Sequence, residues 1–99
     1  DIMSKKFNSP LEAQFFGTEE ISIANSGDDI IEDNHEWSFK PRAKYFSFMN
    51  YDECQVSING SKPILLMREQ GIYFQHPTQY IDSFVVLTDN VHYQVLGGF

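Results

Sequence analysis

The stretch YFSFMNYDECQVSING, residues 45–60, carries the clearest structural pattern in the chain. In YFSFMN (45–50) the two phenylalanines stand at alternate positions, and in CQVSI (54–58) every second residue is again apolar. Successive side chains of a strand point to opposite faces of a sheet, so this spacing predicts two half-buried strands. The pair Asn59-Gly60 that follows favours a tight turn, because both residues readily adopt positive φ.

The same alternation extends in both directions from this stretch. EEISIAN (19–25) places Ile21 and Ile23 on one face, which is typical of a half-buried strand. Residues 28–44 are ambiguous between a turn of helix and an irregular crossing, and Pro41 stops any helix from continuing. Further strands are expected in LEAQFF (11–16), ILLM (64–67), IYFQ (72–75), SFVVLT (83–88) and VHYQVL (91–96).

These elements predict the fold class. We expect an all-β protein, a small antiparallel β-sandwich or barrel-like domain of about seven or eight short strands. The aromatic content supports this, since nine Phe, five Tyr and one Trp pack well on a pleated surface. The length of 99 residues suits one domain, which we place at residues 11–99. Residues 1–10 are expected to form an N-terminal arm, with Asp1 and Ile2 a cloning scar ahead of Met3.

The chain is acidic, with 14 acids against 7 bases and a formal charge of −7. This sign opposes binding to a phosphate backbone, so no nucleic-acid partner is expected. No apolar run approaches the roughly 18 residues of a membrane span and no signal-peptide pattern is present, so no membrane partner is expected. Cys54 is the only cysteine, which excludes an internal disulfide and suits a reducing cytoplasm.

The residue pattern argues against catalysis and against a cofactor. His35, His76 and His92 are scattered, without the short spacings that are typical of zinc sites. Cys54 lies in an alternating apolar segment, which indicates a buried structural thiol rather than a nucleophile. No serine elbow, phosphate loop or dinucleotide motif is present. We therefore expect that the protein is not an enzyme.

The densest group of possible metal ligands lies in residues 28–36. Its carboxylates could offer oxygens to calcium, but their spacing matches no calcium-binding loop and the required turn glycine is missing. A solvated acidic loop is the favoured interpretation, and no metal is expected. The weak candidate ligands are Asp28, Asp29, Glu32, Asp33 and Glu36.

Aromatic side chains are the better candidates for binding. A chain this small must bury most of them, which leaves two or three for a protein contact or a sugar-stacking platform. Trp37 with Tyr80 could line such a groove. The arm with Lys5, Lys6 and Phe7 could lie across a neighbouring subunit, and Phe99 after two glycines could insert into an adjacent pocket. A frayed start and a last residue folded back on its own core explain them equally well. The remaining candidates of this kind are Phe39, Tyr45, Tyr51 and Tyr73.

Residues 54–74 read CQVSINGSKPILLMREQGIYF and residues 81–99 read IDSFVVLTDNVHYQVLGGF. A strand leads to an Asn-Gly turn, a short apolar strand, a glycine, an aromatic strand and a hairpin that ends in Gly-Gly and one bulky residue. This scheme resembles that of small virion proteins of tailed bacteriophages and of modules attached to their tail and fibre proteins. It is carried by Asn59, Gly60, Pro63, Gly71, Phe84, Val86, Tyr93, Gly97, Gly98 and Phe99.

The resemblance implies a β-sandwich of the virion, assembled in the host cytoplasm, that acts by self-association or by docking on other virion subunits. Two alternatives remain open. One is a module that binds carbohydrate or a host receptor. The other is a small phage protein that inhibits a host enzyme, with an acidic surface that mimics nucleic acid.

Overall fold

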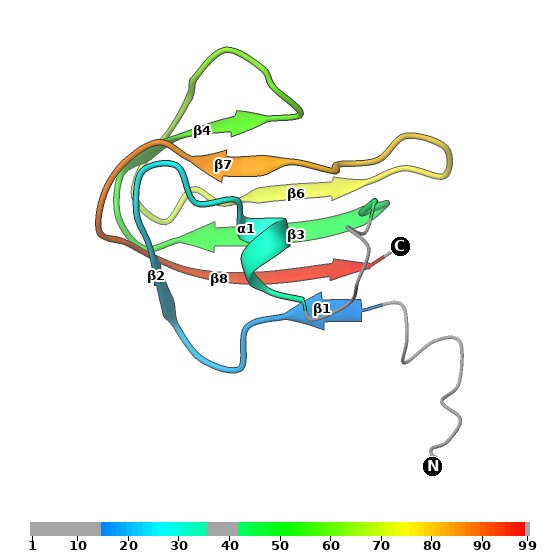
Figure 1. Ribbon diagram of the computed structural model, residues 1–99, viewed down its shortest axis with the longest axis horizontal. Coiled ribbons are helices and arrows are strands. Elements are labelled where there is room, and N and C mark those ends of the chain that lie inside the picture. The colour runs from blue at the N-terminus through cyan, green and yellow to red at the C-terminus, as the bar shows by residue number, and fades with distance from the viewer. Residues whose placement is uncertain (1–14, 36–41, 99) are drawn as a thin grey trace.

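The computed structural model describes residues 15–35 and 42–98, and in this part of the chain eight strands and one short helix form two antiparallel sheets (Figure 1). The predicted all-β class and antiparallel pairing are confirmed, whereas the expected N-terminal arm lies outside the described residues. The elements are β1 (Phe15–Gly17), β2 (Ser22–Ala24), α1 (Ile30–Asp33), β3 (Tyr45–Asn50), β4 (Cys54–Ile58), β5 (Ile64–Leu66), β6 (Ile72–Gln75), β7 (Phe84–Val86) and β8 (Val91–Gly98).

Strand β8 is the centre of the larger sheet. It pairs with β1 and β2 along one side and with β3 along the other, and β6 then pairs with β3. The smaller sheet has the order β5-β4-β7. Because every pairing is antiparallel, the loops of the domain gather at its two ends.

The core lies between the two sheets and is filled by alternate strand residues, as the spacing predicts. Val56 and Phe84 are fully buried, and Val95 is only 5% exposed. The ring of Phe84 in the smaller sheet packs against Phe46 and Phe48 of the larger sheet, at centroid distances of 4.9 and 4.7 Å. Aromatic pairs at such distances contribute about 0.5–1.5 kcal/mol each beyond the area that they bury.

The predicted strand over residues 19–25 is present as the shorter β2. It is half-buried as expected, but the covered side is that of Ala24, which is 1% exposed, while Ile23 is 54% exposed. The register explains this, because Ala24 pairs with the inward-facing Val91 and Ile23 pairs with His92 on the opposite side of the sheet.

Of the two interpretations for residues 28–44, the turn of helix is confirmed by α1. Asp29 caps it, since its carboxylate accepts hydrogen bonds from the backbone N–H groups of Ile31 and Glu32 at 3.0 and 3.4 Å. Ile30 and Ile31 are fully buried and tie the turn to the core. Among the residues that the structure describes, no helix has the length and apolar character that crossing a bilayer requires.

The predicted turn at Asn59-Gly60 is confirmed, with φ of 50° and 75°. The Asn59 side chain also fixes the neighbouring loop. Its carbonyl oxygen accepts the backbone N–H groups of Asp82 and Ser83 at 2.9 and 3.1 Å, and its amide nitrogen donates to the Tyr80 carbonyl at 3.0 Å.

Asn50 is the one fully buried polar residue of the described core. Its amide nitrogen donates to the carbonyls of Asp52 and Met67 at 2.9 and 2.8 Å, and its side-chain oxygen accepts the N–H of Gly71 at 2.8 Å. These bonds join the loop after β3 to the loop between β5 and β6. Because β5 and β6 belong to different sheets, Asn50 fixes the point where the chain crosses from one sheet to the other.

Replacing Asn50 by alanine should lower the free energy of unfolding by about 2–4 kcal/mol, because it removes three part-buried hydrogen bonds to the backbone and each contributes about 0.5–1.5 kcal/mol. Urea unfolding followed by circular dichroism measures the change. Gln55→Ala, on an exposed position of β4, is the matched control and should change it by less than about 0.5 kcal/mol. Equal effects of the two substitutions would contradict the role given to Asn50.

Candidate functional site

The charged residues of the described chain all lie in loops or in α1. No residue of the strands β1 to β8 is Asp, Glu, Lys or Arg. A sheet face that stays in water is usually polar and in part charged. Both sheets of this domain therefore present neutral surfaces.

The larger of these surfaces is the side of the five-stranded sheet that faces away from the core, which we call the outer face. The pairing register places its residues in rows that run across β1, β8, β3 and β6, with Ile23 of β2 beside His92. The outer face consists of Phe15, Gly17, Ile23, Tyr45, Ser47, Met49, Tyr73, Gln75, His92, Gln94, Leu96 and Gly98.

The outer face is unusually apolar for a surface. Of the nine large apolar side chains exposed among the described residues, five belong to it: Phe15, Ile23, Met49, Tyr73 and Leu96. Tyr73 is the most exposed, at 64%. Aromatic residues and methionine are enriched, and acidic residues and lysine depleted, in the centre of protein–protein interfaces. The outer face has that composition.

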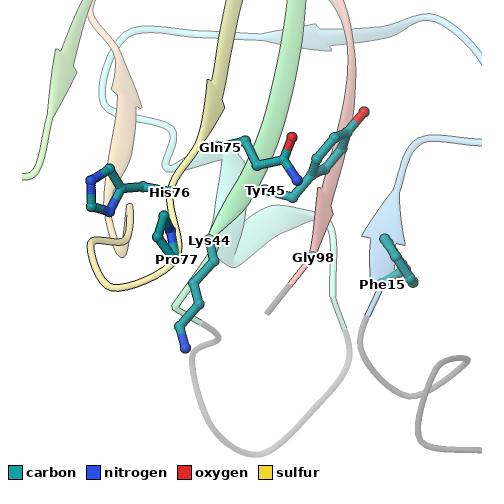
Figure 2. Close-up of a pocket in the computed structure, with 7 residues that line it drawn as sticks. All are labelled: Phe15, Lys44, Tyr45, Gln75, His76, Pro77 and Gly98. Atoms are coloured by element: carbon teal, nitrogen blue, oxygen red, sulfur yellow. The ribbon is translucent and has the colours of Figure 1, made fainter.

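A groove crosses the outer face at the end of the strands. The register sets Phe15, Gly98, Tyr45 and Gln75 side by side, and Gly98 leaves a gap between the two rings because it has no side chain. Figure 2 shows Phe15 on one side of Gly98 and Tyr45 with Gln75 on the other. The groove has a volume of about 570 Å³ and is completed by Lys44, His76 and Pro77.

The preceding glycine has a different role on the inner side of the sheet. A Cβ atom on Gly97 would lie 2.3 Å from the ring of Phe16, so only glycine lets that ring pack there. Phe16 is 7% exposed and closes the core beside β8. The Gly-Gly pair thus admits one phenylalanine inside the domain and opens the groove outside it.

Polar groups of the outer face are already bound to one another. The Tyr73 hydroxyl donates to Gln75 Oε1 at 2.7 Å, and its ring meets that of Tyr45 edge to face at 5.7 Å. Further along the sheet the Tyr51 hydroxyl donates to Gln94 Oε1 at 2.6 Å. These contacts fix the side chains before any partner arrives, which reduces the entropy lost on binding.

His92 and Asp52 form the only ion-pairing contact at the outer face among the described residues. His92 Nδ1 and the backbone N–H of His92 both lie 2.8 Å from the same oxygen of Asp52. The backbone N–H, and then the ring, hold the pKa of the Asp52 carboxyl below its ordinary value of 3.8. His92 lies on the side of β8 opposite to the buried Val91 and Tyr93.

Of the four predicted binding residues, only Tyr80 lies in the described part of the chain. Phe7, Trp37 and Phe99 lie outside the described residues, so the proposed groove of Trp37 with Tyr80 is not described. Tyr80 itself is half-buried away from the outer face, with the guanidinium of Arg42 4.9 Å above its ring. Tyr45 and Tyr73, from the wider aromatic set, do lie together on the outer face.

Two of the acidic candidates around α1, Asp28 and Asp29, serve the local fold. Asp28 accepts the N–H of Asn25 at 2.8 Å, and Asp29 is the helix cap. Burial, and then the neighbouring carboxylates, raise the pKa of Asp33. Within residues 15–35 and 42–98, no group of His, Cys, Asp or Glu is placed to hold a metal ion. Glu36 lies outside the described residues.

Cys54 is 2% exposed, as its place in the alternating segment predicts. Burial raises the pKa of its thiol, so it is a poor nucleophile at neutral pH. Phe15, Met49 and Leu96 are the exposed large apolar residues of the outer face that the sequence analysis did not name. The available signal was the absence of charge at the alternate positions of 45–50 and 91–96.

Comparison of the chain with protein-family models, with curated proteins and with solved structures finds no match.

The lowered pKa of Asp52 predicts how stability depends on pH. Its contribution is complete above 3.8, the ordinary value, and is lost as the pH falls through the lower value of the folded state. In urea unfolding between about pH 5 and pH 2, the stability difference between wild type and Asp52→Asn should therefore shrink as the pH falls. Glu53→Gln, which removes the neighbouring carboxylate, is the control and should lose as much stability as the wild type does when the pH falls. A difference between wild type and Asp52→Asn that stays constant would contradict the prediction.

Proposed function

We propose that this chain is a non-enzymatic assembly protein that docks on other protein subunits through its outer face. The observation that carries the proposal is an exposed apolar surface whose strands contain no Asp, Glu, Lys or Arg, in a chain of formal charge −7. Exposed patches of this kind mark interaction sites. The hollows of the surface suit a protein partner, because Gly98, Gly17 and Ser47 leave gaps between the larger residues.

The setting that we propose is the particle of a tailed bacteriophage, where the partners are other virion subunits and further copies of the chain. This part of the proposal is supported by the resemblance of residues 54–99 to small virion proteins. A small sandwich with prearranged surface side chains suits such a role, because a subunit that binds without rearrangement loses little conformational entropy.

A carboxylate placed on the outer face should prevent docking. Tyr73→Glu and Leu96→Glu would each bury an unpaired charge in the contact, which should weaken association at least about tenfold. Gln55→Glu, on the outer side of the smaller sheet, is the matched control and should have no effect. Incorporation into purified phage particles, measured by mass spectrometry, and sedimentation velocity of the purified protein are the readouts. A chain that is monomeric and also absent from particles would refute the proposal.

One observation favours a second candidate, a carbohydrate-binding module. The groove combines aromatic rings, which stack on the apolar faces of sugars, with the amide of Gln75 and the hydroxyl of Tyr45, which can bond sugar hydroxyls. This function predicts binding to neutral oligosaccharides on a glycan array and its loss in Tyr45→Ala. An array without signal, or a signal that survives Tyr45→Ala, would exclude the groove as a sugar site.

A further inference from the structure

The loops of the domain divide into two ends with different charge. One end is where β3 and β7 finish and β8 begins, and it carries loops 25–28, 51–53, 67–71 and 87–90. The other is where β3 begins and β6 and β8 finish, and it carries loops 42–44, 59–63 and 76–83. In Figure 1 the first set of loops lies at the left of the sheets, and loops 42–44 and 76–83 of the second set lie at the right.

The first set, which we call the acidic end, has five acids and one base: Asp28, Asp52, Glu53, Glu69 and Asp89 with Arg68. The second set, which we call the basic end, has three bases and one acid: Arg42, Lys44 and Lys62 with Asp82. A positive end is the exception in a chain of formal charge −7. The two ends are therefore complementary in sign.

The bases of the basic end are available to a partner. Arg42, Lys44 and Lys62 are all exposed, and no carboxylate in the described part of the chain forms an ion pair with them. At the acidic end Glu53, Glu69 and Asp89 are exposed as well. Complementary charges of this kind steer and orient two proteins, but exposed pairs contribute only about 0–1 kcal/mol each, so affinity needs an apolar contact too.

The two ends also offer matching apolar shapes. Met67 projects from the acidic end, where its side chain is 54% exposed and its carbonyl is held by Asn50 at 2.8 Å. The groove beside Lys44 at the basic end is lined by the rings of Phe15 and Tyr45. Thioether sulfur packs favourably against aromatic rings, and a methionine side chain adapts to an irregular groove.

We propose that copies of this chain associate head to tail, with the acidic end of one copy docked on the basic end of the next and Met67 in the groove. Contacts between two acidic ends are disfavoured by like charge, so the pairing has one direction. A contact between two different surfaces of the same chain builds a ring if the rotation closes and a filament if it does not. This inference uses the groove of the outer face and adds the two charged ends, on which docking by the rest of the outer face does not depend.

Charge reversal tests the proposal. The acidic-end variant is Glu53→Lys with Glu69→Lys, and the basic-end variant is Lys44→Glu with Lys62→Glu. In sedimentation velocity at low salt, the wild type should associate, each variant alone should be at least about tenfold weaker, and their equimolar mixture should regain association. Glu19→Lys with Glu20→Lys changes the net charge as much as the acidic-end variant does, away from both ends, and is the matched control.

Two further measurements separate this contact from docking by the outer face. Association at the ends should weaken as salt rises from about 20 mM to about 500 mM, because screening shortens the reach of exposed charges. Met67→Ser should weaken it on the order of tenfold, whereas Leu65→Ser, an equally exposed apolar residue of β5, should not. A monomeric wild type at low salt, or a mixture that does not associate, overturns the proposal. An oligomer insensitive to salt but lost in Tyr73→Glu also overturns it while supporting the outer face.

Discussion

The packing of Phe84 against Phe46 and Phe48 is the contact that makes one domain of two sheets. Phe84 belongs to a strand of three residues, which its backbone ladder alone would hold weakly. Two other elements fix it: β4, whose Ile58 lies opposite, and Asp29, whose carboxylate accepts the Phe84 N–H at 3.4 Å. Since Asp29 also caps α1, the helix turn, the edge strand and the aromatic core depend on one another.

Because the strands are short, hydrogen bonds from polar side chains are needed to hold the loops of the fold in place. Asn50 joins the crossing between the sheets, and Asn59 joins the turn after β4 to the loop before β7. Each makes several bonds to backbone groups that a longer strand would satisfy within its own ladder. Such side chains determine the conformation of the loops, whereas the strand register determines that of the sheets. Fixed loops are what hold the two charged ends and the groove in place.

Local periodicity was enough to predict β3 and β4 and the faces that they bury. The buried apolar residues are every second one in each strand, namely Phe46 and Phe48 in β3 and Cys54 and Val56 in β4. Periodicity could not decide which face of β2 is covered, since alternation defines two faces and Ile23 happens to pair on the outer one.

Nor could local periodicity reveal the role of Asp29, because its bond to Phe84 spans 55 residues and leaves no local pattern. The outer face likewise depends on pairing between strands that are distant in sequence, which local periodicity does not reveal. Tyr45 and Tyr73 were candidates as aromatic residues, but only the register of strands distant in sequence places them on one face with Phe15.

The positions of the charged residues show which parts of the surface are protected against association with other β-sheets and which parts are not. Exposed edges are commonly guarded by lysine and proline. The chain follows this rule at the edge strand β5. Lys62 and Pro63 stand directly before this strand, and Arg68 stands shortly after it. The faces of the sheets have no such guard, because none of the strands in residues 15–35 and 42–98 carries a charged residue. The five large apolar side chains exposed on the outer face have no such guard, and this is the basis of the proposal that this face docks on another subunit.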